Sequence, residues 1–244
     1  MLRILAVTLA MLLSVNAASA VDLGKILTKV DEVRAPTDFS VDVKVVGPKG
    51  QKLEMLVRVR GGDKSLVLYT APSNSAGRSL LFVEANMWIY VPGTRRPIRI
   101  SPNQQILGGV SSADIARTVF DGDYKAVSAA GVSRDSRIKA PGGAKLEEIT
   151  LQPRHRKTTY GKINLVVDQN GNPYRAVFYS LSGRALKTAY FTKYKNVLGK
   201  RRPMGLDIYD HIEGGELTTI RYSGMQPSKT PASWFQPNFL QRLK

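Results

Sequence analysis

A period of two in the hydrophobic pattern dominates the chain from residue 40 onward. Val41, Val43 and Val45 alternate with polar residues, a Gly-Pro-Lys-Gly tetrapeptide follows, and residues 52–59 alternate again before Gly-Gly-Asp-Lys. Such alternation places apolar side chains on one face of a β-strand, and glycine-containing tetrapeptides between the runs are typical of turns. The pattern therefore predicts consecutive antiparallel hairpins.

Strand patterns continue through the second half of the chain. The segments are YKAVSA, KLEEITL, YGKINLVVD, NPYRAVFYS, LKTAYFTKY, GLDIYDHI and ELTTIRYS. Turns rich in Gly, Asn and Pro separate them, and no helix alternates with the strands as it would in βαβ units. The sequence thus predicts a mainly β (α+β) fold with one antiparallel domain over residues 21–244.

Three short segments show helical spacing instead. The first follows Asp22 as a candidate cap and stops before Pro36, and the second begins at Ser111 and Asp114, which have the spacing of a capping box. The third is SWFQPNFLQRL at the end of the chain. The residues expected to face inward are Leu23, Ile26, Leu27, Val30 and Val33 in the first, Ile115, Ala116 and Val119 in the second, and Trp234, Phe239 and Leu240 in the third.

The segment 79–100 carries apolar residues on both faces of its predicted strands. With residues 84–86 as a three-residue loop, the facing pairs are Phe82–Trp88 and Leu80–Tyr90 on an aromatic face, and Val83–Met87 and Leu81–Ile89 on an aliphatic face. The next turn adds Ile98 and Ile100 to the aliphatic face and places Arg99 opposite Trp88. A guanidinium over an indole ring is a favourable cation–π pair.

This pattern leaves two interpretations of the hairpin open. In one, the aromatic face lines a concave cavity and the aliphatic face packs against helices. In the other, the hairpin is a sandwich strand buried on both faces, with Arg99 at its rim.

The N-terminus has the three parts of a secretory signal. Arg3 precedes an apolar stretch that is too short to span a bilayer, and Ala18-Ser19-Ala20 forms a cleavage site. We expect residues 1–20 to be removed after Ala20, which leaves a soluble periplasmic protein. Position 21 is Val, not the cysteine of a lipoprotein signal, and the chain contains no cysteine. Its stability therefore depends on the hydrophobic core alone.

The charge is strongly one-sided, at +17 for the full sequence. Such an excess favours anionic partners such as membrane headgroups, acidic proteins or nucleic acid. The secretory signal argues against nucleic acid. We expect transient contact with an anionic membrane surface.

Residues suited to catalysis are few. The two histidines, His155 in PRHRK and His211 in YDHIEGGE, lie in predicted loops without a second histidine at metal-ligand spacing. Asp121 and Asp123 in FDGDY lack the other ligands of a calcium loop. We therefore expect no enzyme activity, no metal site and no cofactor.

Several motifs resemble the outer-membrane lipoprotein-sorting family (LolA/LolB-like), in the branch associated with inner-membrane lipid-exporting transporters. They are the run RGGDKSLVLYTAPSNSAGRSLLFVEANMWIYVPGTRRPIRIS, the segments SSADIARTVF and DGDYKAV, TYGKINLVVDQNGNPYRAVFYS, and the terminal WFQPNFLQRL. MWIYVP is the most specific of them. ILGGVSSADIA departs from the glycine-serine-aspartate stretch that usually precedes the middle helix in that branch.

The resemblance implies a half-open, strongly curved antiparallel β-barrel of about eleven strands, with short helices as a lid over an apolar cavity. The predicted ligand cavity is Leu80, Phe82, Trp88, Tyr90 and Arg99; the lid is Ile106, Leu107, Ile115 and Val119; and the docking surface is Arg95, Arg96, Arg201 and Arg202.

Two functions follow from this resemblance as hypotheses. The first is a periplasmic carrier that shields a lipid or an acylated protein between the inner and outer membranes, after receiving it from an inner-membrane transporter. The alternative is a sensor or adaptor of the same fold that regulates a membrane partner.

Overall fold

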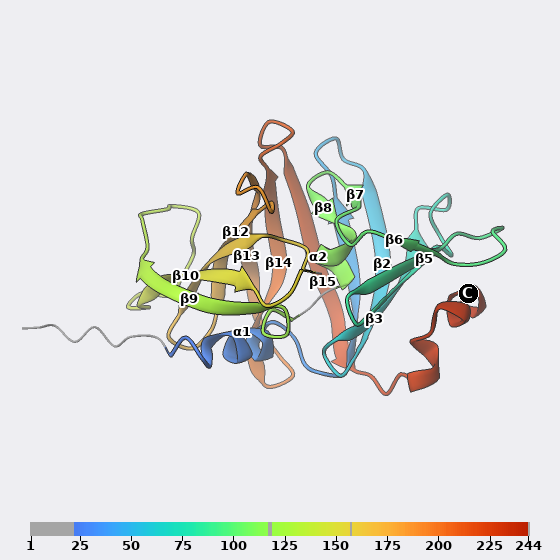
Figure 1. The fold of residues 1–244 in the computed structure, drawn as a ribbon, viewed down its shortest axis with the longest axis horizontal. Helices are drawn as coiled ribbons and strands as arrows, with labels where there is room; N and C mark the ends of the chain where they lie inside the picture. Colours follow the sequence, from blue (N-terminus) through green and yellow to red (C-terminus); the bar gives the residue numbers. More distant parts are fainter. Residues whose placement is uncertain (1–21, 117–118, 157, 244) are drawn as a thin grey trace, which may run out of the picture.

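The computed structural model describes residues 22–116, 119–156 and 158–243, so the predicted signal over residues 1–20 lies outside the described residues. Within them, a single strongly curved antiparallel sheet has the strand order β6-β5-β4-β3-β2-β1-β15-β14-β13-β12-β11-β10-β9 (Figure 1). Consecutive strands are neighbours within each half, β1–β6 and β9–β15. The β1–β15 pairing joins the two halves, and β6 and β9 form the two edges. Short turns between consecutive alternating runs produce this meander.

The bounds of the sheet strands follow directly from the alternating runs. They are β1 (Phe39–Val46), β2 (Lys52–Arg60), β3 (Lys64–Ala71), β4 (Ser79–Val83), β5 (Asn86–Tyr90), β6 (Ile98–Ile100), β9 (Tyr124–Gly131), β10 (Leu146–Pro153), β11 (Lys162–Asp168), β12 (Pro173–Tyr179), β13 (Ala185–Val197), β14 (Lys200–Asp210) and β15 (Leu217–Pro227). A separate small hairpin is formed by β7 (Gln105–Leu107) and β8 (Val110–Ser111).

The mainly β prediction is confirmed, and the sheet is not closed, because its order ends at β6 and β9. The expected number of strands was wrong: the described residues form 13 strands in the main sheet and two more in the small hairpin. Strands of two or three residues, such as β6, β7 and β8, are too short to show a period in the sequence.

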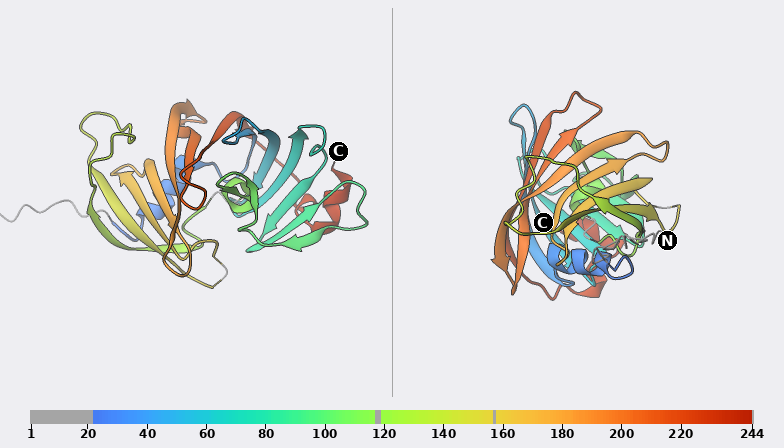
Figure 2. Two further views of the ribbon diagram at one scale, coloured as in Figure 1. Left: turned by 90° about the horizontal axis from the view of Figure 1, so that it is seen from above. Right: turned by 90° about the vertical axis from the view of Figure 1, so that its left-hand side faces the viewer.

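The curved sheet wraps around one large hydrophobic core. Inward residues of the strands pack there with Ile26, Leu27 and Val30 of α1 (Ile26–Arg34) and with Ile115 and Ala116 of α2 (Ser112–Ala116). Both helices therefore lie on the concave side, and Figure 2 shows the two halves of the sheet curving around that side. A second, smaller cluster lies on the outer face, beneath the 3₁₀ helices η1 (Ala232–Trp234) and η2 (Pro237–Arg242).

The register of the β4–β5 hairpin differs from the prediction by one residue. Val83 pairs with Asn86 across a two-residue turn of Glu84 and Ala85, whose φ angles are 58° and 81°. Two positive φ angles are typical of a tight turn that usually contains Asn-Gly, so Glu-Ala gave no sequence signal for it. A shift of one residue moves side chains to opposite faces of the sheet.

The predicted aromatic and aliphatic faces are therefore wrong. The residues that point to the concave core are Leu80, Phe82, Met87 and Ile89. The residues on the outer face are Leu81, Val83, Trp88 and Tyr90, which pack with the C-terminal cluster. The pairing of Arg99 with Trp88 and of Ile98 and Ile100 with β5 is confirmed.

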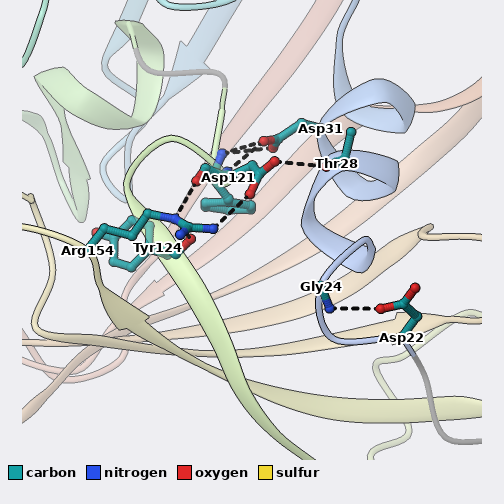
Figure 3. Close-up of polar contacts among 8 residues, drawn as sticks. Asp22, Gly24, Thr28, Asp31, Asp121, Tyr124 and Arg154 are labelled. Carbon is teal, nitrogen blue, oxygen red and sulfur yellow. Dashed lines mark hydrogen bonds and ion pairs between the residues drawn. The ribbon is translucent and has the colours of Figure 1, made fainter.

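The first two predicted helices form with adjusted ends, whereas the C-terminal segment forms the two 3₁₀ helices η1 and η2. α1 begins at Ile26, after a turn in which the Gly24 N–H donates to Oδ1 of Asp22 at 3.0 Å (Figure 3). In the C-terminal segment Leu240 is buried as expected, whereas Phe235 is buried without having been predicted, and Trp234 is half-buried.

Candidate functional site

Two small cavities lie between the concave face of the sheet and the two helices. Each has a volume of about 50 Å³, which is room for a few water molecules. Arg34, Asp114, Phe191 and Leu206 line both cavities, so the two are separated only by shared side chains. The first is otherwise lined by Ala35, Phe39, Val41, Val43, Val57, Ile115, Pro203, Tyr222 and Met225, and the second by Ala113, Val119, Phe120, Tyr124, Thr159, Tyr160, Ile163, Phe178, Ala189 and Ile208.

The apolar lining comes from the period-two pattern of the strands. Alternate residues of β1 and β13 face inward, so Val41 and Val43 line one cavity while Ala189 and Phe191 lie along the other. Burial of aliphatic and aromatic surface in such an interior stabilises by about 25 cal/mol for each Å² removed from water. Such an interior offers few groups for polar recognition.

Polar contacts of Asp114 connect α2 to the sheet within the apolar interior. Asp114 accepts hydrogen bonds from the Ser111 backbone N–H at 2.7 Å and the Ser111 hydroxyl at 2.9 Å, as the capping-box pattern predicted. It also accepts one from the Tyr160 hydroxyl at 2.8 Å. Lys187 of β13 forms an ion pair with the same carboxylate and donates to the carbonyl oxygen of Gly109 at 3.1 Å.

This Asp114 network, consisting of Ser111, Asp114, Tyr160 and Lys187, is shielded from solvent. The side chains of Lys187 and Asp114 are 6% and 9% exposed. Burial raises the pKa of Tyr160 well above its ordinary value, which keeps its hydroxyl a neutral donor. Removing one partner of a buried ion pair leaves the other charge uncompensated, so Asp114 and Lys187 depend on each other.

Arg34 brings a positive charge to the boundary between the two cavities. Its guanidinium stands 4.2 Å above the centroid of the Phe120 ring, and its NH1 lies 3.6 Å from Oδ1 of Asp31. Burial lowers the pKa of Arg34 from its ordinary value, with the Asp31 carboxylate opposing that shift. Arg34 therefore places a guanidinium against the apolar lining that the two cavities share.

Asp31 ties the segment after α2 to α1. Its carboxylate accepts the backbone N–H groups of Phe120 and Asp121, each at 2.8 Å (Figure 3). Asp121 in turn accepts the Thr28 hydroxyl at 2.8 Å, and Arg154 contacts its carboxylate at 3.3 Å. Of the two aspartates in FDGDY, Asp121 therefore has a structural role: it connects α1 to the loop that follows α2.

Burial raises the pKa of Asp31 from 3.8 to about 6, although Arg34 and the two backbone N–H groups oppose the shift. The folded state therefore favours the protonated acid, so the contribution to stability is fully present below pH 3.8 and lost as pH rises through about 6. Asp31→Asn lacks this titrating group and serves as the reference. As pH rises from 4 to 7.5, the free energy of unfolding of the unmodified protein is expected to fall by up to about 3 kcal/mol relative to that of Asp31→Asn. Urea unfolding of both proteins at several pH values measures this difference, and a difference independent of pH would contradict the assignment.

The residues predicted to line the ligand cavity lie in three places. Leu80 and Phe82 are on the concave side but line neither cavity. Trp88 and Tyr90 are on the outer face, which corrects their predicted position. Arg99 is exposed on edge strand β6 and hydrogen-bonds the Asn86 side chain.

The predicted lid residues come closer to the site. Ile115 lines the first cavity and Val119 the second, while Ile106 and Leu107 are half-buried against the same core. The hydroxyl of Ser65 donates to the carbonyl oxygen of Ala116, which holds the end of α2 against β3.

Sequence reasoning missed Arg34, Lys187 and Phe191. A signal for Lys187 was present, since it has the same parity on β13 as the inward residues Ala189 and Phe191. An inward-facing lysine requires a buried partner. Which partner it has depends on the position of α2, which no strand pattern reveals.

The predicted docking arginines do not form one surface. Arg95 and Arg96 are exposed between β5 and β6, whereas β4, β3, β2, β1 and β15 separate them from β14. Arg202 is only 3% exposed, and its guanidinium donates to the carbonyl oxygens of Glu32 and Val33 at the end of α1. Arg202 therefore stabilises the packing of α1 and is not a surface residue. Arg201 is half-buried, with its guanidinium 4.0 Å from the Tyr194 ring centroid.

The two histidines make ordinary pairwise contacts. Nε2 of His155 lies 3.2 Å from Oδ1 of the buried Asp123, and Nε2 of His211 is 2.8 Å from the Thr188 hydroxyl. Among residues 22–116, 119–156 and 158–243, no group of three potential metal ligands comes together.

Comparison with solved structures identifies the family. A LolA superfamily protein from Nitrosomonas europaea is 32% identical to this chain, covers 89% of it and 98% of its own length, and superimposes with a TM-score of 0.76. The chain belongs to the LolA superfamily. The resemblance expected from the MWIYVP strand is thereby confirmed.

Other comparisons give coarser information about this LolA superfamily member. An outer membrane lipoprotein-sorting protein domain from Vibrio parahaemolyticus shares the fold at 19% identity, with a TM-score of 0.72 over 90% of this chain and 98% of that one. A family model described as an uncharacterized protein matches residues 61–242. A search of curated proteins gives no match. Among the described helices, none is both long and apolar enough to cross a bilayer.

Proposed function

We propose that this LolA superfamily protein is a periplasmic carrier that takes up acyl chains of a lipid or a lipoprotein on the concave side of its sheet. The observation that carries the proposal is the apolar interior around Phe191 and Leu206, which is covered by α2, a short helix held in part by the Asp114 network. Membership of the superfamily supports the same conclusion, since its fold suggests a carrier of lipids or lipoproteins.

Uptake requires α2 to move. Cavities of about 50 Å³ have no room for an acyl chain while Ile115 is seated between the sheet and the helices. Displacement of α2 exposes the inward faces of β1 and β13, and each methylene that an acyl chain buries there contributes about 0.8 kcal/mol. Breaking the Asp114 network is part of the free-energy cost of that displacement.

The direction of transfer follows from the proposed location. In this proposal an inner-membrane transporter delivers the lipid or acylated protein to the carrier, which releases it toward the outer membrane. No covalent step is needed, because binding and release depend on apolar burial alone. Neither a cofactor nor a catalytic residue is part of the proposal.

Binding of a fluorescent fatty acid tests the interior directly. Phe191→Ala removes a ring that lines both cavities and is expected to weaken binding by about 10-fold or more, since a fully buried phenylalanine contributes about 1.5–3 kcal/mol. Phe239→Ala makes the same change on the outer face and is the matched control, with unchanged binding expected. Circular dichroism establishes that both variants are folded before binding is measured.

Equal binding by the two variants would place the fatty acid elsewhere and overturn the proposal. Organic extraction of the purified protein, followed by mass spectrometry, identifies the lipid that it carries. Transfer of that lipid between donor and acceptor vesicles then separates a carrier, which moves it, from a sensor, which binds and retains it.

A further inference from the structure

A groove lies between the outer face of the sheet and the C-terminal 3₁₀ helices. Figures 1 and 2 show these helices, in red, on the opposite side of the sheet from α2. The groove has a volume of about 320 Å³, larger than the interior cavities. The residues that line it are Leu56, Arg58, Leu66, Leu68, Trp234, Phe239, Arg242 and Leu243. Strands β2 and β3 form its floor and η1 and η2 form its wall.

Half-buried aromatic rings stand at the surface of this groove. The rings of Trp234 and Phe239 are stacked with centroids 4.9 Å apart, and the Arg58 guanidinium lies 5.7 Å from the Trp234 ring centroid. Phe235 and Leu240 are the buried residues that anchor the C-terminal segment to the sheet. Because those two provide the anchor, Trp234 and Phe239 remain available at the surface.

The charge around the groove is positive. Arg58 and Arg242 line it, and no acidic residue is among its lining residues. η2 is also joined to the exposed β5–β6 turn, where the Gln241 side-chain amide donates to the carbonyl oxygen of Arg95 at 3.1 Å. Glu54, on the same strand as Arg58, has its charge paired with Lys44 at 2.8 Å.

We propose that this outer face docks on an anionic bilayer. The arginines would lie at the phosphate level, while the stacked rings enter the boundary between headgroups and acyl chains, where aromatic side chains with a polar or charged neighbour are stable. A bilayer presents anionic and apolar groups over an extended surface, which matches arginines spread from the groove to the β5–β6 turn. The outer face of a curved sheet is also the face that can approach a planar surface.

Intrinsic fluorescence measures this docking without a label. The chain has two tryptophans, Trp88 and Trp234, and both pack in the outer cluster. With vesicles of phosphatidylethanolamine and phosphatidylglycerol at 3:1, we expect a blue shift and quenching by brominated lipid, both reversed by high salt. The double variant Arg58→Gln/Arg242→Gln is expected to lower the partition coefficient roughly 25-fold, since each arginine near an anionic leaflet contributes a factor of about five.

The matched control removes the same two charges elsewhere. Arg184 and Lys195 are exposed on the other half of the sheet, so Arg184→Gln/Lys195→Gln should change partitioning by less than about threefold. Equal losses in the two double variants would show that attraction depends on net charge alone and would overturn the proposal. Binding of soluble polyglutamate in place of vesicles would overturn it in favour of an acidic protein partner.

This inference is independent of the carrier function. Binding of the fluorescent fatty acid without vesicles should be the same in Arg58→Gln/Arg242→Gln and in the unmodified protein, because the groove lies outside the interior. Thermal melting of the double variant, compared with the control, shows that a loss of docking is not a loss of folding. An unfolded or destabilised double variant is replaced by Arg242→Gln alone, for which a fivefold loss is expected and an unchanged partition coefficient contradicts the proposal.

Discussion

Replacing Lys187 with methionine is expected to lower the free energy of unfolding by about 3–5 kcal/mol. The substitution leaves the Asp114 carboxylate, 9% exposed, without its cationic partner inside an apolar interior. Because methionine has a similar length, the loss of stability comes more from the lost charge pairing than from lost packing. Chemical denaturation monitored by circular dichroism measures it.

Two comparison variants make this result specific. Lys195 lies on the same strand, β13, but is exposed, and Lys195→Met should change stability by less than about 0.5 kcal/mol. Lys187→Met/Asp114→Leu removes both charges and should recover much of the stability, because an apolar pair of similar volume replaces a buried ion pair at little cost. If Lys187→Met is no more destabilising than Lys195→Met, the Asp114 network does not hold α2.

Replacing Ile115 with lysine should be similarly severe and should also abolish binding of the fluorescent fatty acid. Ile115 is 5% exposed and lines the first cavity beneath α2. A lysine there either buries an unpaired ammonium near Arg34 or forces α2 out of the interior, at a cost of more than about 3 kcal/mol. Urea unfolding and fatty-acid titration of the same samples measure both effects.

Ile98 provides the matched control for that substitution. It is an isoleucine on the edge strand β6 and is 58% exposed. Ile98→Lys makes the same chemical change where water solvates the charge, and neither stability nor binding should change appreciably. Normal fatty-acid binding by a folded Ile115→Lys protein would show that α2 does not cover the binding surface.

The sequence alone predicted the features that depend on local periodicity. Alternation along residues 41–45 and 52–59 predicted β1 and β2 as a hairpin, and the Ser111–Asp114 spacing predicted the hydrogen bonds that begin α2. These features involve residues close together in the chain, whose geometry follows from a period of two or from one turn of helix. Motifs such as MWIYVP were sufficient for the family.

Only the tertiary structure decided which face of each strand is inside and which charges are buried. The tight turn at Glu84-Ala85 exchanged the two faces of β5 relative to β4, because one residue of register moves every side chain of a strand to the other side. Arg202 was predicted to lie on a docking surface, and the inward parity of Lys187 gave no partner for it. Their partners, the α1 carbonyls and Asp114, lie far away along the chain. Burial and pairing of a charge depend on contacts between distant segments, and local patterns contain no information about those contacts.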